Sequence, residues 1–348
     1  MKFSRRSALL AAATAAALTL TACGGTASSE PSASGSPDSA AVSITHSYGT
    51  TTFEQAPERV ATISWVNADT LLALGTVPVG MDKDTWGNND NGSTDWKDEK
   101  LEELGAGIGS ENAPVQFDAT DGINYTQIAE AKPDAIFAAY SGLTKEEYDK
   151  LSKIAPVVGP IEPNYTTSWQ DATEAAGKML HKQDEAKTLV DSVNQQIADA
   201  ASKYPIFKDT TFIAGNLEPA AGGINIYATG DTRPRFLSQL GMTQAEVVDK
   251  NAKEGEFYYN FAAERASELE ADIFFTWVPA GSTAQDVIAE NKLFGQIPAA
   301  KTGGFVALDS DMQLLAISAA SPLSLPWVLD KVVPKLGDAA NKVAEAKK

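Results

Sequence analysis

Cysteine and histidine are nearly absent from this sequence. Among 348 residues there is one cysteine, Cys23, and there are two histidines, His46 and His181. A single cysteine excludes an intramolecular disulfide and a thiolate cluster for zinc or iron–sulfur. A direct zinc or manganese site normally combines several histidines with carboxylates. We therefore expect no metal bound directly by side chains, and no resident cofactor.

Basic residues are also few. Lys and Arg together number 28 against 46 Asp and Glu, so the formal net charge is −18. A chain this acidic is repelled by the phosphates of nucleic acid and by anionic lipid surfaces. Nucleic acid is therefore excluded as a partner.

Catalytic motifs are missing as well. The sequence has no Gly-x-Ser-x-Gly elbow, no His-Glu-x-x-His helix and no Walker loop. With two isolated histidines and one thiol, general-base chemistry has few candidates. We expect a binding protein and not an enzyme, and a surface hydrolase is the weaker alternative.

The beginning of the chain is typical of an exported lipoprotein. Three cations precede an apolar run over residues 8–20, which is too short to cross a bilayer comfortably. The run ends in Leu-Thr-Ala-Cys23, with small residues just before the cysteine. We predict a signal peptide over residues 1–22 and lipid on Cys23. Removal of the three cations takes the formal charge from −18 to −21.

A flexible tether follows the predicted lipid. Residues 24–41 are rich in Gly, Ser, Ala and Pro, a composition that cannot build a core. We predict a disordered tether over residues 23–42 that holds the protein on the extracytoplasmic face of the cell membrane. Paired arginines near the start leave both the general and the twin-arginine export routes open.

The remaining chain, about 300 residues, is long enough for two lobes. Apolar runs over residues 59–65, 134–140, 209–215 and 272–277 predict buried strands. Helical patterns alternate with these runs, which favours parallel sheets covered on both faces. We predict an α/β fold with an N-terminal lobe over 43–165 and a C-terminal lobe over 205–348.

Residues 166–204 are predicted to connect the lobes through helices. The pattern is helical almost without a break from Trp169 to Lys203. Its second part places apolar side chains on one stripe at spacings of three and four, namely Ala186, Leu189, Val190, Val193 and Ile197. Twenty helical residues span about 30 Å, enough to join two lobes. Closure around a ligand should then be a modest rocking motion.

The two halves also echo each other. Thr70-Leu-Leu-Ala-Leu-Gly75 resembles Phe236-Leu-Ser-Gln-Leu-Gly241. Asn124 and Asn260 each stand before a helical stretch, an acidic residue and an apolar strand, and asparagine is a good helix cap. Either the halves are built alike or the likeness is a coincidence among α/β units.

Three stretches carry a resemblance to a known family. They are Pro57–Ala61 with Ala68–Gly80, Ile123–Asp134 through Pro156, and Ser321–Trp327. The chain resembles the iron–siderophore binding proteins of ABC transporters, whose two Rossmann-like lobes are joined by one long helix (the class III periplasmic-binding-protein fold). Together with Trp86 and Trp96, the last stretch is similar to the actinobacterial branch. The resemblance implies a monomeric lipoprotein that delivers a ferric siderophore to an ABC permease.

The resemblance also implies docking residues. In this family each lobe usually presents a surface glutamate to arginines of the permease. The C-terminal one falls on Glu264, whereas its N-terminal counterpart falls on Thr126, which cannot form a salt bridge. Glu130 lies one helical turn further on and is the expected substitute.

Candidate ligand-binding residues follow from the strands. Ligands of open α/β sheets lie beyond the carboxyl ends of the strands. Aromatic residues gathered there suit a bulky chelate with flat, partly apolar faces. The strand ends supply Trp65, Asn67, Tyr140, Ser141, Asn216 and Trp277, and residues expected in loops supply Trp86, Tyr258 and Tyr259.

Arg233 and Arg235 complete the candidate site. They lie in a turn before a helix, and guanidinium groups suit the oxygens of catecholate, hydroxamate or carboxylate chelators. The alternative is that both arginines pair with the protein's many carboxylates. The arginines favour an anionic chelate and the overall acidity favours a cationic one, so the sign stays open.

The ligand's identity is also left open by the sequence. We expect a ferric siderophore, with haem or a corrinoid as alternatives. A cell-envelope lipoprotein that acts through protein contacts is a further alternative, because Thr126 removes a docking glutamate.

Overall fold

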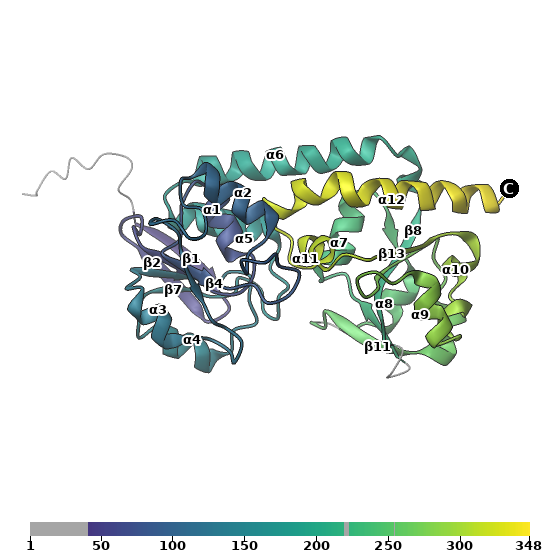
Figure 1. Cartoon of the computed structure of the whole chain (residues 1–348), viewed down its shortest axis with the longest axis horizontal. Coiled ribbons are helices and arrows are strands. Elements are labelled where there is room, and N and C mark those ends of the chain that lie inside the picture. The colour runs from purple at the N-terminus through teal and green to yellow at the C-terminus, as the bar shows by residue number, and fades with distance from the viewer. Residues whose placement is uncertain (1–40, 219–222, 254) are drawn as a thin grey trace, which may run out of the picture. The chain divides into compact units, whose positions relative to one another are not determined.

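The computed structural model describes residues 41–218, 223–253 and 255–348 (Figure 1). The predicted signal peptide, Cys23 and nearly all of the predicted tether lie outside these residues. Within the described ranges, no helix is both long and apolar enough to span a lipid bilayer.

The N-terminal lobe is built on a fully parallel five-stranded sheet, as the sequence predicts. Its strand order is β5-β4-β3-β6-β7. The strands are β3 (Val60–Thr62), β4 (Gly80–Asp82), β5 (Val115–Phe117), β6 (Ala135–Phe137) and β7 (Val157–Val158). The connecting helices are α1 (Asn67–Ala73), α2 (Asp95–Glu103), α3 (Tyr125–Glu130) and α4 (Lys145–Leu151). A hairpin of β1 (Val42–His46) and β2 (Gly49–Phe53) precedes the sheet.

The C-terminal lobe differs from the expected parallel sheet. Strands β8 (Thr211–Glu218), β10 (Thr243–Gln244), β12 (Ile273–Trp277) and β13 (Phe305–Leu308) pair in parallel. Strands β9 (Gly223–Tyr227) and β11 (Tyr258–Ala262) extend the sheet antiparallel beyond β8. The first half of β8 pairs with β10 and its second half with β9, so one long strand carries two neighbours on one edge.

Short helices connect these strands. They are η2 (Pro205–Asp209), α7 (Thr232–Gln239), α8 (Glu246–Asn251), η3 (Ala263–Glu268), α9 (Ala284–Glu290), η4 (Phe294–Gln296), α10 (Pro298–Thr302) and α11 (Asp311–Ser318). The prediction that Asn260 caps a helix is wrong, because Asn260 lies inside β11 and the short helix η3 begins at Ala263. The alternating exposure of β11 shows that strand pairing overrides the local capping preference here.

The connection between the lobes is shorter than the predicted continuous helix. The chain forms α5 (Trp169–Met179) and α6 (Gln183–Ser202), which pack against each other. His181, between them, has a left-handed φ of 55° and breaks the helix. Only α6 joins the lobes: Ala186 packs in the N-terminal core, whereas Ile197 packs with C-terminal residues.

A second helix, α12 (Ser324–Ala346), lies along α6 (Figure 1). Val328 and Leu336 of α12 are fully buried and belong to the same apolar cluster as Val193 of α6 and Trp96 of the N-terminal lobe. The two lobes therefore share a continuous apolar core beside these helices, which favours the limited rocking expected from the sequence.

Both sheets are covered on both faces, and the period-two alternation of a strand explains how. In β6, Phe137 enters one apolar cluster and Ile136 another. In β12, Phe275 and Phe274 divide in the same way between two clusters. β6 is buried throughout and β12 is buried up to its last residue, Trp277, as their continuous apolar sequence predicts.

The internal echo reflects equivalent structure. Helices α1 and α7 are each followed by a glycine of positive φ, Gly75 at 71° and Gly241 at 95°. The next strands, β4 and β10, then pair in parallel with β3 and β8. Asp134 accepts from the N–H of Arg59 (2.9 Å) just before β3, and Asp272 accepts from the N–H of Thr211 (3.0 Å) at the start of β8. The predicted cap at Asn124 is also formed, by acceptance from the N–H of Gln127.

Candidate ligand-binding cleft

The N-terminal half of the site lies where β3, β4 and β6 end. After β3 the chain turns sharply at Ser64, a residue of positive φ (67°), whose N–H donates to a carboxylate oxygen of Asp82 at 2.7 Å. This turn leaves the next side chain, Trp65, 44% exposed. Trp65 lines a pocket together with Asp82, Ser141 and Tyr165.

Asn67 joins the strand ends beneath this pocket by hydrogen bonds, but it is not one of the residues that line the pocket. Its side chain is completely buried and donates to the carbonyls of Ile63 (2.7 Å) and Tyr140 (2.9 Å). It also accepts from the N–H of Tyr140 at 3.0 Å. Asn67 therefore ties the end of β3 to the end of β6, and its place among the ligand contacts is a wrong prediction because no surface of it is accessible.

Aromatic rings line the N-terminal pocket. Trp65 stacks on Tyr165 with ring centroids 5.8 Å apart, and Tyr165 lies 5.6 Å from the buried ring of Tyr140. Burial raises the pKa of the Tyr140 hydroxyl, so it stays a neutral hydrogen-bond donor. Tyr165 was not predicted, because nothing in its loop sequence distinguishes it from a surface residue.

Aromatic rings also line the C-terminal half. Tyr227 at the end of β9 stacks on Trp277 at the end of β12, with centroids 5.9 Å apart. Trp277 and Asn216 line a second pocket, as the strand-end rule predicts for both residues. Tyr258 lies opposite Tyr227 in the β9–β11 pair and is 43% exposed.

Tyr258 and Tyr259 lie in strand β11 and not in a loop. Successive residues of a strand point to opposite faces, so Tyr259 turns away from Tyr258 and packs against the apolar cluster that contains Val248. Burial raises the pKa of Tyr259 to about 12. Trp86 is an exposed loop residue and follows Thr85, which lines the N-terminal pocket.

One carbonyl group receives a hydrogen bond from each half of the site. The Tyr140 hydroxyl donates to the carbonyl of Ser318 at 3.1 Å, and the Thr232 hydroxyl donates to the same carbonyl. Tyr140 belongs to the N-terminal lobe, and Thr232 begins α7 of the C-terminal lobe. The Ser318 carbonyl, in the C-terminal lobe, thereby links Tyr140 of the N-terminal lobe to the beginning of α7.

Arg233 is present at this junction but its charge is already paired. Its Nε and Nη2 donate to the two carboxylate oxygens of Asp231 at 2.8 and 2.6 Å. The guanidinium carbon lies 3.4 Å from the centroid of the Tyr227 ring. Burial lowers the pKa of Arg233, but Asp231 outweighs burial and the pKa stays above its ordinary value. Arg233 and Asp231 therefore form a bidentate ion pair that is largely buried.

Arg235 is also engaged within the protein. Its Nη1 donates to the carbonyl of Thr166 at 2.7 Å, a contact from α7 to the segment before α5. The sequence left open whether the two arginines meet a ligand or pair internally. In the structure Arg233 pairs internally, with the carboxylate of Asp231. Among the described residues Arg235 pairs with no carboxylate and donates to a backbone carbonyl instead.

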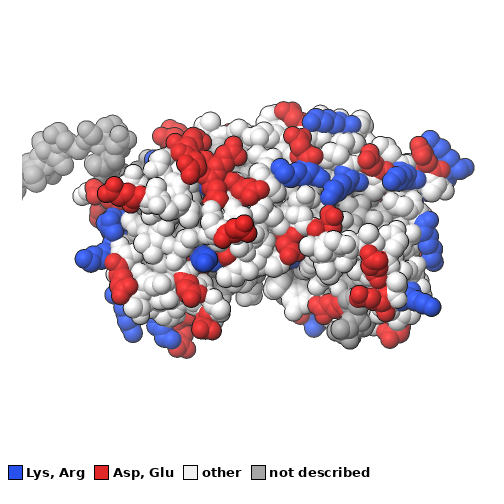
Figure 2. Space-filling view, in the orientation of Figure 1, with Lys and Arg blue, Asp and Glu red and all other residues white. Residues whose placement is uncertain are grey.

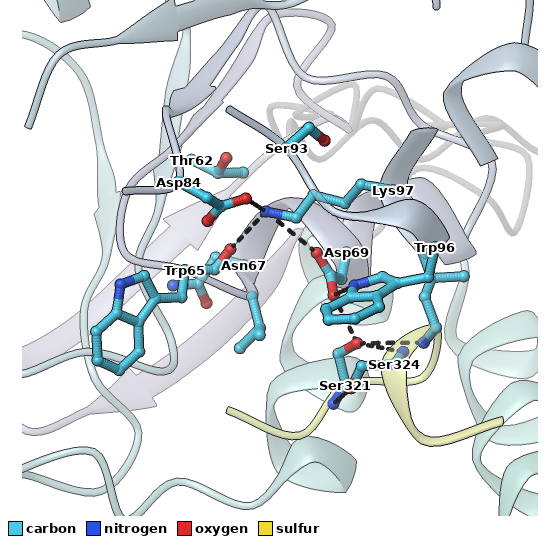
Figure 3. A network of polar contacts seen from close by, with 12 residues as sticks. Thr62, Trp65, Asn67, Asp69, Asp84, Ser93, Trp96, Lys97, Ser321 and Ser324 are labelled. Carbon is cyan, nitrogen blue, oxygen red and sulfur yellow. Dashed lines mark hydrogen bonds and ion pairs between the residues drawn. The ribbon is translucent and has the colours of Figure 1, made fainter. Parts of the chain in front are cut away.

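A buried ionic network supports the N-terminal pocket from behind (Figure 3). Lys97 of α2 is 2% exposed; its ammonium pairs with Asp84, lies 3.9 Å from an oxygen of Asp69, and is 3.4 Å from the carbonyl of Trp65. Burial lowers the pKa of Lys97, but Asp84 and Asp69 outweigh it and the pKa lies above its ordinary value. The ammonium is therefore charged, and it stabilises the turn at Trp65 by donating to the carbonyl of that residue.

The same network reaches the C-terminal segment. Asp69 accepts from the indole N–H of Trp96 at 2.6 Å and from the hydroxyl of Ser321 at 2.7 Å (Figure 3). Burial raises the pKa of Asp69 to about 6, and Lys97 and Ser321 limit the rise. Ser321 lies three residues before the start of α12, so the network links α1 and α2 to the beginning of that helix.

The histidines lie away from these pockets. His46 is buried in β1 and shares a hydrogen bond with the hydroxyl of Thr51 at 3.0 Å, while His181 occupies the α5–α6 turn. In the part of the chain that the structure describes, no group of three or more His, Cys, Asp or Glu side chains is arranged to hold a metal ion.

The candidate docking residues are all exposed. Glu264 lies in η3 of the C-terminal lobe, and Thr126 and Glu130 lie in α3 of the N-terminal lobe. Thr126 and Glu130 border a shallow apolar depression together with Lys150 and Lys153.

Comparison with known proteins identifies the family. Residues 60–312 match the model of the periplasmic binding protein family. This chain belongs to that family. Its two-lobed architecture is that of the class III periplasmic binding proteins, as the resemblance implied.

Individual relatives and solved structures are similar to this chain over most of its length. The chain is 26% identical to the Fe(3+)-citrate-binding protein YfmC of Bacillus subtilis over 265 residues, 76% of each protein. It is similar to the crystal structure of Streptococcus pneumoniae PiaA in complex with ferrichrome, with 32% identity, a TM-score of 0.78, and coverage of 86% of this chain and 99% of that one. A periplasmic solute binding protein of Mycobacterium smegmatis is 27% identical, with a TM-score of 0.70 and coverage of 86% and 99%.

Proposed function

We propose that this protein captures a ferric siderophore in the cleft between its lobes and delivers it to an ABC permease. Membership of the periplasmic binding protein family supports capture and delivery of a solute. The observation that carries the ligand class is the pair of aromatic rows, Trp65 with Tyr165 in the N-terminal lobe and Tyr227 with Trp277 in the C-terminal lobe. Such rows offer flat, partly apolar surfaces to a bulky chelate.

The siderophore supplies the iron ligands in this proposal. PiaA, the relative with 32% identity, was crystallised with ferrichrome, and YfmC is named for ferric citrate. In this chain the tyrosine hydroxyl nearest the junction, that of Tyr140, is used by Ser318, and both histidines lie away from the pockets. Iron would therefore arrive already wrapped, and haem or a corrinoid would find no free axial ligand among these groups.

The remaining parts of the assignment concern place and partners. We propose that Cys23 carries lipid, that the protein works as a monomer on the extracytoplasmic face of the cell membrane, and that it carries out no catalysis. Glu264 is the proposed contact of the C-terminal lobe with the permease. Glu130, four residues after Thr126 on α3, is the proposed contact of the N-terminal lobe.

A titration tests the ligand class. Purified protein is titrated with a ferric hydroxamate, a ferric catecholate, ferric citrate, haem and cobalamin, and tryptophan fluorescence is followed. Trp65 and Trp277 border the pockets, so a bound ferric complex should quench their emission at low concentration. Quenching by haem or cobalamin alone would reject the siderophore and leave solute transport in place. A cell-envelope protein acting through protein contacts would bind none of the five.

Docking requires a separate test in cells. Uptake of radiolabelled iron with the bound siderophore should disappear on deletion of the gene and return with the wild-type copy. The Glu264→Ala protein should bind the ferric siderophore as the wild type does, but its gene should not restore iron uptake to the deletion strain. The reason is that the carboxylate is proposed to contact only the permease. Full uptake by this variant would remove Glu264 from the docking surface.

A further inference from the structure

The sequence leaves open whether the ligand is an anionic, neutral or cationic iron chelate. The charged side chains around the cleft address this question. This inference rests on the proposed function. The site itself is defined by the strand ends and aromatic rows described above, and the charged side chains around it decide only the sign of the ligand. Acidic side chains gather in places on the face of the molecule in Figure 2, and α2 carries five of them, but long-range charge is screened within about 8–10 Å in salt. The charged side chains close to the ligand must therefore determine which ligand charge the cleft prefers.

Carboxylates predominate among the described residues that line the two pockets. The N-terminal pocket contains Asp82 and Glu147 with a single cation, Lys83. The C-terminal pocket contains Asp286, Glu290 and Asp311 and no lysine or arginine among its lining residues. An anionic chelate placed between these pockets would meet five carboxylates for one ammonium group, and each unfavourable pair strengthens as water leaves the cleft.

The two arginines do not reverse this balance. Arg233 forms a bidentate pair with Asp231, so the pair contributes no net charge to the site. It can still donate hydrogen bonds from Nη1, but a donor without net charge serves neutral oxygens as well as anionic ones. Arg235 donates to the carbonyl of Thr166 and is not among the residues that line either pocket.

The ionisation state of Asp82 agrees with this reading. Burial raises its pKa to about 6, and hydrogen bonding from Ser64 limits the rise. At neutral pH its carboxylate is therefore mostly ionised. The carboxylates of Glu147 and Asp286 accept hydrogen bonds at the caps of their own helices, from Thr144 and Thr283, and both residues line the pockets.

We infer that this cleft selects ferric chelates that are neutral or positively charged and discriminates against anionic ones. Tris-hydroxamate complexes of iron(III) have a neutral core and carry whatever charge their side groups add, so they fit this requirement. Tris-catecholate and citrate complexes of iron(III) are anions and do not fit. The Arg233–Asp231 pair is the element that removes the positive charge an anionic chelate would need.

One chelate scaffold with three charges tests the inference directly. Ferrioxamine B has a neutral iron–hydroxamate core and one pendant ammonium group. Acetylation of that amine gives a neutral complex, and succinylation gives an anionic one of similar shape. We expect the cationic and neutral forms to bind, and the anionic form to bind at least about tenfold more weakly at low salt. The difference should shrink at 1 M NaCl, where screening acts within about 3 Å.

Single substitutions test which charged side chains cause the preference for one ligand charge over another. Glu290→Gln on the exposed end of α9 should weaken the cationic form about two- to fivefold and leave the neutral form unchanged. Glu185→Gln on α6 makes the same charge change away from the pockets and should alter neither. Asp231→Asn keeps a capping side chain but releases the charge of Arg233, so it should improve binding of the anionic form.

The outcomes separate the inference from the function on which it rests. Equal or tighter binding of the succinylated form, or tighter binding of ferric citrate or a ferric tris-catecholate, overturns the charge selectivity while siderophore capture stands. If no ferric complex of any charge binds, siderophore capture itself fails and the inference fails with it. Correct folding of each variant is checked by its circular dichroism spectrum and thermal unfolding.

Discussion

The hydroxyl of Ser321 donates to a carboxylate oxygen of Asp69 at 2.7 Å, although the two residues are 252 positions apart in the sequence. Both side chains are completely buried. Asp69 belongs to α1 of the N-terminal lobe and Ser321 to the segment that leads into α12. This hydrogen bond is a direct polar link between the first lobe and the last helix, on the hinge side of the cleft.

Removing that link should destabilise the fold measurably. Ser321→Ala is expected to lower the free energy of unfolding by at least about 1.5–3 kcal/mol, because it removes the buried hydrogen bond to the Asp69 carboxylate. It also removes the bonds that the Ser321 hydroxyl oxygen accepts from the N–H groups of Leu323 and Ser324. Urea unfolding followed by circular dichroism measures the change. Ser318→Ala is the matched control: its hydroxyl is buried without a partner among the described residues, so its removal should have little effect. Equal effects of the two variants would show that Ser321 contributes by packing alone.

The buried ammonium group of Lys97 should contribute more to the free energy of unfolding than the ammonium group of an exposed lysine. Lys97→Met leaves Asp84 and Asp69 without their buried cation, so we expect a loss of about 3–5 kcal/mol. Lys100→Met on the same helix removes a pair with the exposed Glu103 and should change stability by less than about 1 kcal/mol. Thermal or urea unfolding compares them. A Lys97→Met variant as stable as Lys100→Met would contradict the buried pair.

The raised pKa of Asp82 predicts a pH dependence of stability. In the folded protein its pKa is about 6, above the ordinary value of 3.8, chiefly because of burial. The folded state then binds the proton more tightly than the unfolded state, and the contribution of this group to stability falls as pH rises from about 4 to about 6. Above pH 6 the contribution stays constant at its lowest value.

Asp82→Asn isolates this effect. The amide oxygen can still accept from Ser64, but it does not titrate. Relative to the wild type, the variant should gain up to about 3 kcal/mol of stability between pH 4 and pH 7. Urea unfolding at pH 4, 5, 6 and 7 measures the difference between the two proteins, in which the titration of Asp69 cancels. A constant difference across this range would mean that Asp82 keeps an ordinary pKa.

Trp65 should be the aromatic residue on which the ligand depends most in the N-terminal lobe. It is 44% exposed and stacks on Tyr165 at the pocket wall. Trp65→Ala is expected to weaken the ferric complex about tenfold, or about 1.4 kcal/mol, with little change in unfolding. Val115→Ala is the control, because Val115 is 49% exposed and lies outside both pocket linings. Equal affinity of the two variants would place the ligand elsewhere.

Local patterns were sufficient for much of the architecture. The apolar runs that contain β3, β6, β8 and β12 are strands, and the cap at Asn124 is present, because these features depend on neighbouring residues. The likeness between the Thr70 and Phe236 segments corresponds to helices α1 and α7. Asn260 was misassigned because the pairing of β11 with β9 involves residues distant in the chain.

The site was predicted less completely than the fold. Trp65, Ser141, Asn216 and Trp277 line the pockets because strand ends must gather at one edge of a parallel sheet. The sequence could not distinguish Asn67 from them, although its amide is buried. Nor could it reveal Tyr165, which reaches the cleft from an irregular segment.

The sequence by itself determined the α/β class, the two lobes, the helix between them and, through its motifs, the family. The class, the lobes and the helix follow from periodicity and composition, which are local, whereas the family follows from the resemblance that the motifs carry. Only the tertiary structure decided the charge of the cleft. Whether Arg233 offers a free cation depends on Asp231 folding back against it, and whether Lys97 is a surface charge or a buried one depends on which carboxylates the fold brings to it. Electrostatic energy depends on distance and burial, and neither is written in the order of residues.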